Sequence, residues 1–132
     1  MKKIIVNGTF DILHRGHIEM LNYAKSLGSY LLVLIDTDRR VKELKGEGRP
    51  INNQHDRWFM LKNIKTVNDV WFFDSREDLI DKIKLFSPDI MVKGSDYKDR
   101  SVIGKELVPE VIFYDRTEHS TTKTIQDIIA RG

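Results

Sequence analysis

The sequence predicts an α/β protein whose open, parallel sheet has five strands and carries helices on both faces. Five short runs are rich in aliphatic, β-branched and aromatic residues, and they lie at 4–6, 30–35, 70–73, 89–92 and 111–114. Because these runs do not alternate apolar with polar residues, they are typical of parallel strands that are covered on both sides. Helical patterns separate most of the runs, and right-handed crossovers between parallel strands place such helices on both faces of the sheet.

Each helical pattern repeats apolar residues every three or four positions, and most follow a polar residue that could cap a helix. The patterns cover 18–27, 53–65, 75–87 and 121–129. Gly28 stands where a C-terminal cap belongs, and Asn52 or Asn53 and Ser75 are candidate N-terminal caps. Residues 39–50 are polar, basic and glycine-containing, so we expect a loop or a frayed helix with a mobile end there.

Composition excludes several classes of protein. The 132 residues suit one compact domain spanning 1–132, and the net charge of +2 argues against a nucleic-acid partner or a membrane surface. The absence of cysteine excludes disulfides and thiolate chemistry. No apolar run approaches the ~18 residues that span a bilayer. We therefore expect a cytoplasmic protein.

The predicted order of elements is Rossmann-like, and ligands of such sheets bind beyond the carboxyl ends of the strands. After the first strand, His14 and His17 lie three residues apart at the start of a helix, where free amides and the helix dipole favour an anion. A phosphate there would raise the pKa of both imidazoles from ~6.5, so that they could donate hydrogen bonds as cations. The alternatives are a metal site, which would need further ligands, or two solvated histidines.

Other strand ends carry further groups suited to phosphate. Lys45 and Arg49 lie on the glycine-containing segment and could close over phosphates, although a solvated charged loop is the alternative. Near the C-terminus, Ser120 and Thr121 at a helix start form a second anion-binding point facing the first, or simply cap the helix.

The string Thr9-Phe10-Asp11 followed by His14-Arg15-Gly16-His17 resembles the HxGH signature of the cytidylyltransferase-like nucleotidyltransferases. The resemblance extends from Lys3 to about Ile129. It implies transfer of a nucleoside monophosphate from a nucleoside triphosphate to a phosphorylated acceptor, with release of pyrophosphate and no covalent enzyme intermediate. It further implies that His14 and His17 contact the triphosphate and stabilise the pentacovalent transition state. The nucleotide-binding residues that it implies are Gly8, Thr9, Phe10, Asp11, Gly16, Arg57, Lys93, Gly94, Asp96, Ser120, Thr121 and Thr122.

Different segments of the sequence resemble two different branches of this superfamily. Residues 44–51 and the string Lys93-Gly94-Ser95-Asp96-Tyr97 resemble the adenylyltransferase domain of the bacterial ADP-heptose synthases, which implies that Lys45 is catalytic and contacts triphosphate oxygens. Residues 116–122 resemble the RTExxSTT segment of the glycerol-3-phosphate cytidylyltransferases, with one residue fewer, and His119 departs from both patterns. A heptose-1-phosphate-type adenylyltransferase is expected, with the glycerol-3-phosphate enzyme as the alternative. The resemblance leaves ATP or CTP, and the acceptor itself, open.

The remaining expectations follow from the resemblance. Asp36, Asp38 and Arg116 would bind the acceptor, although each aspartate could equally end its strand in an Asx turn. Arg57 and Lys93 have alternative readings as surface cations. Mg²⁺ would be bound mainly by the triphosphate because the sequence offers no dedicated carboxylate cage. A homodimer is implied, and a non-catalytic nucleotide-binding module is the alternative of another class.

Overall fold

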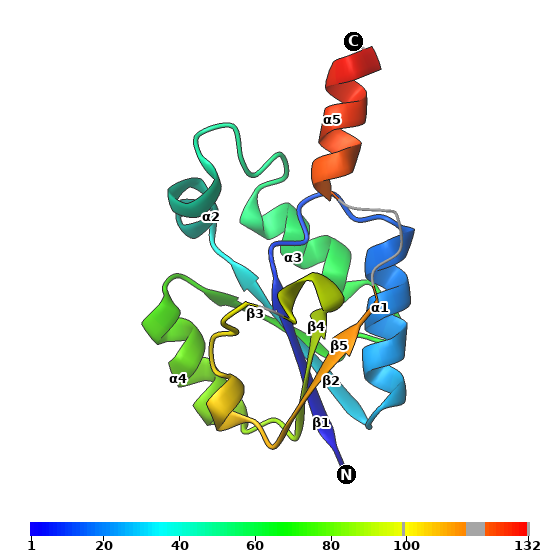
Figure 1. Ribbon diagram of the computed structural model, residues 1–132, viewed down its shortest axis with the longest axis vertical. Helices are drawn as coiled ribbons and strands as arrows, with labels where there is room; N and C mark the ends of the chain where they lie inside the picture. Colours follow the sequence, from blue (N-terminus) through cyan, green and yellow to red (C-terminus); the bar gives the residue numbers. More distant parts are fainter. Residues whose placement is uncertain (99, 116–120, 132) are drawn as a thin grey trace.

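The computed structural model describes residues 1–98, 100–115 and 121–131 and contains a five-stranded, all-parallel sheet (Figure 1). The strands are β1 (Lys3–Gly8), β2 (Tyr30–Asp36), β3 (Asp69–Phe73), β4 (Ile90–Gly94) and β5 (Glu110–Tyr114). Their order across the sheet is β3-β2-β1-β4-β5. The predicted open parallel sheet is confirmed.

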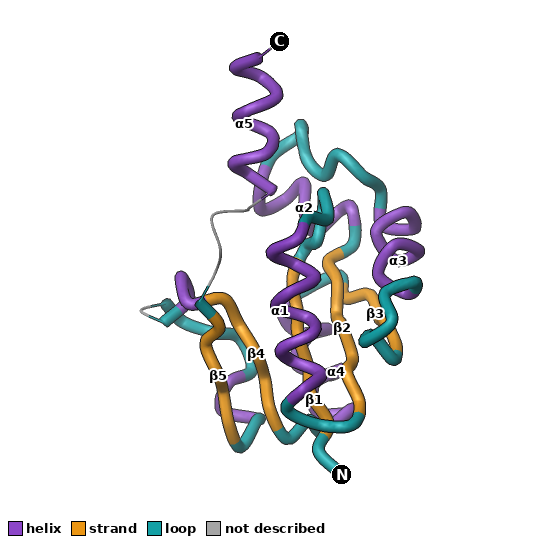
Figure 2. Tube along the Cα trace, turned by 90° about the vertical axis from the view of Figure 1, so that its right-hand side faces the viewer, coloured by secondary structure: helices purple, strands orange, loops and turns teal. Residues whose placement is uncertain are grey.

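Helices cover both faces of this sheet. The helices are α1 (Arg15–Ser26), α2 (Asp38–Lys45), α3 (Gln54–Lys62), α4 (Arg76–Phe86) and α5 (Thr121–Arg131), with short 3₁₀ turns η1 (Ser95–Tyr97) and η2 (Lys105–Leu107). Helices α1 and α3 pack on one face and α4 on the other. The ribbon in Figure 1 and the tube in Figure 2 both show α5 projecting from the end of the molecule where the strands finish. No helix in the described ranges is long and apolar enough to cross a membrane.

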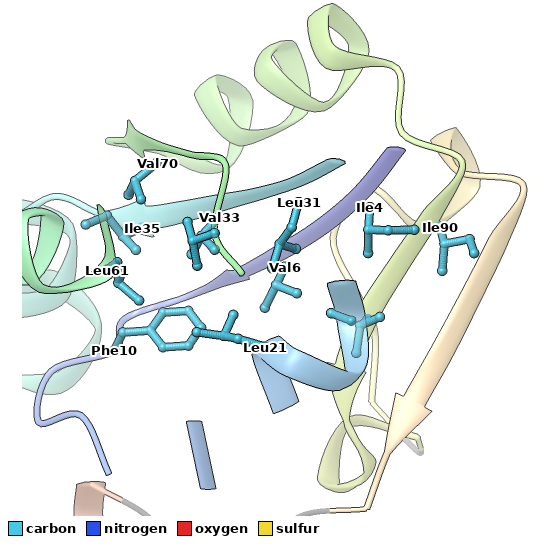
Figure 3. Packing of buried hydrophobic residues seen from close by; sticks show 13 residues of the cluster. Ile4, Val6, Phe10, Leu21, Leu31, Val33, Ile35, Leu61, Val70 and Ile90 are labelled. Carbon is cyan, nitrogen blue, oxygen red and sulfur yellow. The ribbon is translucent and has the colours of Figure 1, made fainter. Parts of the chain in front are cut away.

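Two hydrophobic clusters lie on opposite faces of the sheet because successive strand residues point to opposite sides. One cluster joins Val6 and Val33 to Leu21 of α1 and Leu61 of α3 (Figure 3). The other joins Ile5 and neighbouring strand residues to α4 and to the segment 102–108. The strands are therefore buried on both faces, which explains why their sequences lack alternation.

The segment 39–45 differs from its prediction as a loop or frayed helix, because it belongs to the regular helix α2. The Thr37 side chain caps this helix by accepting a hydrogen bond from the Arg40 amide at 3.3 Å. Val41 anchors it in the core, and Gly46 ends it at φ 97° and ψ 175°. The side-chain cap and the buried valine outweigh the polar composition that suggested a loop.

The caps predicted for α1, α3 and α4 are found in the structure, and the cap predicted for the last helix lies outside the described residues. The Asn53 side chain accepts from the Asp56 amide at 2.9 Å, and the Ser75 hydroxyl accepts from the Asp78 amide at 3.0 Å. Gly28 directly follows the C-cap of α1. A Cβ there would lie 2.5 Å from the backbone oxygen of Lys2, so close packing requires the glycine.

The strand order reverses direction at β1, since β2 lies on one side of it and β4 on the other. Such a switch point opens a crevice beyond the carboxyl ends of the strands, because the connections leave it toward opposite faces. The loops after β1, β2 and β4 all reach this crevice.

Gly46→Ala should destabilise the protein, whereas Gly48→Ala should not. The backbone of Gly46 lies in a region that is almost restricted to glycine, so alanine there should cost about 1–3 kcal/mol. A Cβ on Gly48 meets nothing within 4 Å, and this position is the matched control. Urea denaturation of both variants measures the difference, and equal stabilities would contradict the role of Gly46 in ending α2.

Candidate active site

A cavity of about 430 Å³ opens at the switch point. Its walls come from the loop after β1, the start of α1, helix α2 and the end of β4. This volume lies within the range of small-molecule sites. Residues at or after the ends of β1, β2 and β4 therefore line one pocket.

His14 and His17 form a reciprocal cap at the start of α1. His14 is the N-cap, and its Nδ1 accepts a hydrogen bond from the Gly16 amide at 3.1 Å. The Nδ1 atom of His17 accepts from the His14 amide at 3.3 Å. The two rings stack with centroids 3.9 Å apart. This arrangement is a capping box made of two imidazoles.

The cap fixes the tautomer of both rings. Because each Nδ1 accepts a backbone hydrogen bond, the proton of each neutral imidazole lies on Nε2. His14 and His17 both line the cavity. Their Nε2–H groups are thus the donors that each ring can offer to an oxygen of a ligand.

The turn between β1 and α1 is strained and tightly packed. Phe10 is buried with φ 52°, a conformation that non-glycine residues rarely adopt. Its ring lies against His17, with centroids 5.2 Å apart, and a Cβ on Gly8 would approach it to 3.2 Å. Gly8 and Phe10 thus act together to hold the second histidine in place.

Asp11 anchors the loop that follows α2. Its buried carboxylate accepts hydrogen bonds from the Ile51 and Asn52 amides, both at 2.8 Å, and pairs with Arg49 at 3.2 Å. The side chain of Asn52 in turn donates to the Asp11 carbonyl at 2.7 Å. The segment carrying Lys45 is therefore tied to the segment carrying the histidines.

Arg57 links the turn after β1, the loop after α2 and the start of α2. Its buried guanidinium donates to the carbonyls of Thr9 and Asn52, both at 3.0 Å, and to the Asp38 carboxylate at 2.9 Å. The alternative reading of Arg57 as a surface arginine is wrong. Its predicted contact with nucleotide stays a prediction, since neither Arg57 nor Asp38 lines the cavity.

The wall formed by α2 and the following loop carries Lys45 and Arg49. Neighbouring protein atoms displace water from Lys45 and thereby lower the pKa of its ammonium group, and repulsion from Arg49 adds to this effect. Asp36 and Asp11 oppose the shift. Adjacent cations of this kind suit a polyanion, which would relieve their repulsion.

A row of polar side chains crosses the carboxyl end of the sheet. Asn7, Asp36 and Lys93 occupy strand positions that point toward the α4 face, and all three line the cavity. Burial raises the pKa of the Asp36 carboxyl, although a backbone hydrogen bond and nearby cations lower it. Burial lowers the pKa of Lys93 to about 8 against the attraction of Asp36 and Asp96. The Lys93 ammonium lies 4.2 Å from the Tyr97 ring centroid.

Comparison with known proteins decides the family. The profile of the family described as Cytidylyltransferase-like matches residues 5–127. The chain belongs to the cytidylyltransferase-like family. The family expected from the Thr9–His17 motif and the expected nucleotidyltransferase class are confirmed.

Individual relatives of this cytidylyltransferase-like chain are longer proteins. It is 43% identical over 128 residues to the bifunctional protein HldE of Helicobacter hepaticus, which covers 96% of this chain and 26% of that protein. It is 46% identical over 122 residues to HldE of Campylobacter fetus, and this match covers 92% of this chain and 26% of that protein. The chain thus spans about a quarter of the length of these relatives.

A solved structure shares the fold. The crystal structure of the lipopolysaccharide core biosynthesis protein from Thermoplasma volcanium superposes with a TM-score of 0.72 at 26% identity. The match covers 87% of this chain and 98% of that one. The Rossmann-like fold class predicted for this cytidylyltransferase-like chain is confirmed.

Most of the predicted site residues meet in the cavity. Those that line it are Gly8, Thr9, Phe10, Asp11, His14, Gly16, His17, Asp36, Lys45, Lys93, Gly94 and Asp96. Arg116, Ser120 and His119 lie outside the described residues, as do the side chains of Thr121 and Thr122 at the start of α5. The opposing anion-binding point that these residues were expected to form therefore stays a prediction.

Some lining residues were not predicted from the sequence. Asn7 and Arg40 supply polar groups, while Phe73 and Leu79 supply apolar surface. Asn7 looked like the end of a strand, and Arg40 was one cation among several in a basic segment. The strand-end rule could have found Asn7, but only the helical form of α2 brings Arg40 to the cavity.

Lys93→Met should stabilise the protein most at neutral pH. The folded-state pKa of about 8 lies below the 10.5 of a free lysine, so the unfolded chain binds more protons between those values. The burial penalty on wild type is full below pH 8, at roughly 3 kcal/mol, and shrinks as pH rises toward 10.5. Chemical denaturation of both proteins from pH 6.5 to 10 measures this difference. A difference that does not change with pH would show that Lys93 keeps an ordinary pKa.

Proposed function

We propose that this chain transfers adenosine monophosphate from ATP to a heptose-1-phosphate-type acceptor, with release of pyrophosphate. The observation that carries the reaction class is the histidine pair, whose Nδ1 atoms are held by backbone amides so that both Nε2–H groups can serve a phosphate. The pair begins a helix at the switch point, where the amides and the dipole also favour an anion.

The chemistry would be an in-line displacement at the α-phosphorus. An acceptor phosphate oxygen forms the new bond to phosphorus, the bond to the bridging oxygen of the β-phosphate breaks, and pyrophosphate leaves. His14, His17 and Lys45 would stabilise the added negative charge of the pentacovalent transition state. Because the attacking phosphate is already an anion, positioning and charge stabilisation suffice, and the protein need supply no covalent nucleophile.

The choice of ATP and a heptose phosphate rests on sequence similarity. The relatives named HldE agree with the branch that Lys45 and the string from Lys93 to Tyr97 resemble, the ADP-heptose synthases. Residues 116–118 favour the glycerol-3-phosphate cytidylyltransferases, which remain the alternative. A nucleotide-binding module without catalysis is the alternative of another class.

Mg²⁺ would be held mainly through the triphosphate. Within 1–98, 100–115 and 121–131, no group of three or more histidines and carboxylates is placed to hold a metal ion. The cavity is instead rich in cations, and the Asp11 carboxylate is already engaged by the 49–52 loop. These side chains fit a metal–triphosphate complex whose ion takes most of its ligands from phosphate oxygens and water, where it would neutralise charge on the phosphates.

A homodimer in the cytoplasm is part of the proposal. Exposed apolar side chains on α3 and α5, among them Phe59, Met60, Ile128 and Ile129, offer surface for a partner subunit. The nearly balanced charge of the chain gives no support for a nucleic-acid partner.

His14→Asn and His17→Gln should each lower kcat at least a hundredfold while leaving the fold intact. Asparagine is a good N-cap and glutamine suits the third helical position of a capping box, so both replacements keep the cap but remove the imidazole Nε2–H. Pyrophosphate release is measured with ATP and CTP, each against heptose-1-phosphate and glycerol-3-phosphate. Thermal unfolding followed by circular dichroism is the control for folding.

The pattern of activity separates the alternatives. Release with ATP and heptose-1-phosphate supports the proposal, and release with CTP and glycerol-3-phosphate supports the cytidylyltransferase. Binding of nucleotide without release in any combination would identify a non-catalytic module. Folded histidine variants that release pyrophosphate at the wild-type rate would overturn the role of the pair.

A further inference from the structure

We propose that Asn7, Asp36 and Arg40 form a subsite that binds the hydroxyl groups of the acceptor and so selects a polyhydroxylated phosphate ester. This inference rests on the proposed nucleotidyl transfer. It concerns the α4 side of the cavity, which the histidine pair does not use. Asn7 and Arg40 carry it, because neither matches the motif of the family resemblance.

Two buried polar atoms on this side lack partners in the described part of the protein. They are Oδ1 of Asn7, at the end of β1, and Nε of Arg40, in α2. Native proteins rarely leave such atoms unpaired, because a buried polar group without a partner has lost the hydrogen bonds that it made to water. Both residues line the cavity, so a ligand there could satisfy both atoms.

Arg40 contrasts with its neighbour Arg39. The Arg39 side chain is 59% exposed, and it binds Asp74 at 3.0 Å and Glu43 at 2.8 Å. The Arg40 side chain is only 15% exposed, and its ion pair with Glu43 is long, at 3.8 Å. Arg39 is thus engaged on the surface, whereas Arg40 is largely buried and lines the cavity.

The groups of the subsite alternate between donors and acceptors. The Asp36 carboxylate and the Asn7 oxygen accept hydrogen bonds, while the Arg40 guanidinium donates them. A hydroxyl group both donates and accepts, so neighbouring hydroxyls of one ligand can satisfy all three side chains. Apolar side chains beside them, Phe73 and Leu79, offer a surface for the carbon skeleton.

Charge argues against a phosphate at this position. Lys45, Arg57 and Arg40 all lower the pKa of the Asp36 carboxyl, and Asp36 in turn attracts Lys93, so this carboxylate lies among several cations. A phosphate dianion in contact with the Asp36 carboxylate would meet its repulsion, whereas Arg49 and the histidine pair, which also line the cavity, offer cations and hydrogen-bond donors. The reacting phosphate therefore belongs at those cations, and the hydroxylated body of the acceptor belongs beside Asn7, Asp36 and Arg40.

Arg40→Gln tests this subsite, with Arg39→Gln as the matched control. In pyrophosphate release with ATP and heptose-1-phosphate, Arg40→Gln should raise the KM for the acceptor roughly tenfold or more, because a hydrogen bond to a charged group is lost. The KM for ATP should stay within about twofold, and Arg39→Gln should change neither KM. Arg40→Lys should recover part of the acceptor affinity because it restores the charge.

A binding measurement tests the subsite without relying on turnover. Calorimetric titration with heptose-1-phosphate should show the same weakening in Arg40→Gln, while titration with inorganic phosphate should not. If heptose-1-phosphate binds through Arg40 but no pyrophosphate is released, the proposed function fails and the subsite stands. If wild type turns over and Arg40→Gln leaves the acceptor KM unchanged, or weakens ATP or inorganic phosphate equally, the subsite is wrong. Failure of heptose-1-phosphate to bind the wild-type protein would also overturn it.

Discussion

The arrangement of this pocket depends on two buried charges, the Asp11 carboxylate and the Arg57 guanidinium. Asp11 holds the loop after α2 through two backbone amides and Arg49, while Arg57 holds the β1–α1 turn, the same loop and the start of α2. Charges out of water must be matched by hydrogen bonds, so these contacts fix the segments tightly. The histidines and the cations of α2 consequently face one cavity from two segments far apart in sequence.

The histidine pair shows how one set of atoms serves both fold and chemistry. The Nδ1 atoms of His14 and His17 satisfy amides that would otherwise lack partners at the start of α1. Those hydrogen bonds place the proton of each neutral imidazole on Nε2, so the local structure sets the tautomer of both rings. Phe10, whose φ is positive, packs its ring against His17 and so helps to hold this histidine in place.

Local patterns were enough to predict the sheet, several helix caps and the edge of the sheet at which the pocket opens. Apolar runs define strands through burial, Asn53 and Ser75 cap helices through contacts three residues away, and the end of β1 follows from the strand itself. The partners of Arg57 and the direction of Arg40 could not be predicted, because they depend on contacts between distant segments. Asp11, which was expected to bind nucleotide, lines the cavity, but its carboxylate binds residues 49–52. No local pattern in the sequence shows these contacts.

The central claim is that the pocket moves a nucleotidyl group rather than a phosphoryl group. Incubation with heptose-1-phosphate and ATP labelled separately at the α- and γ-phosphates tests it most directly. The account predicts that the α-label moves to a new nucleotide-sugar product and the γ-label to pyrophosphate. Transfer of the γ-label to the acceptor, or release of the α-label only as free AMP, would contradict it; CTP is run in parallel so that the choice of base does not decide the outcome.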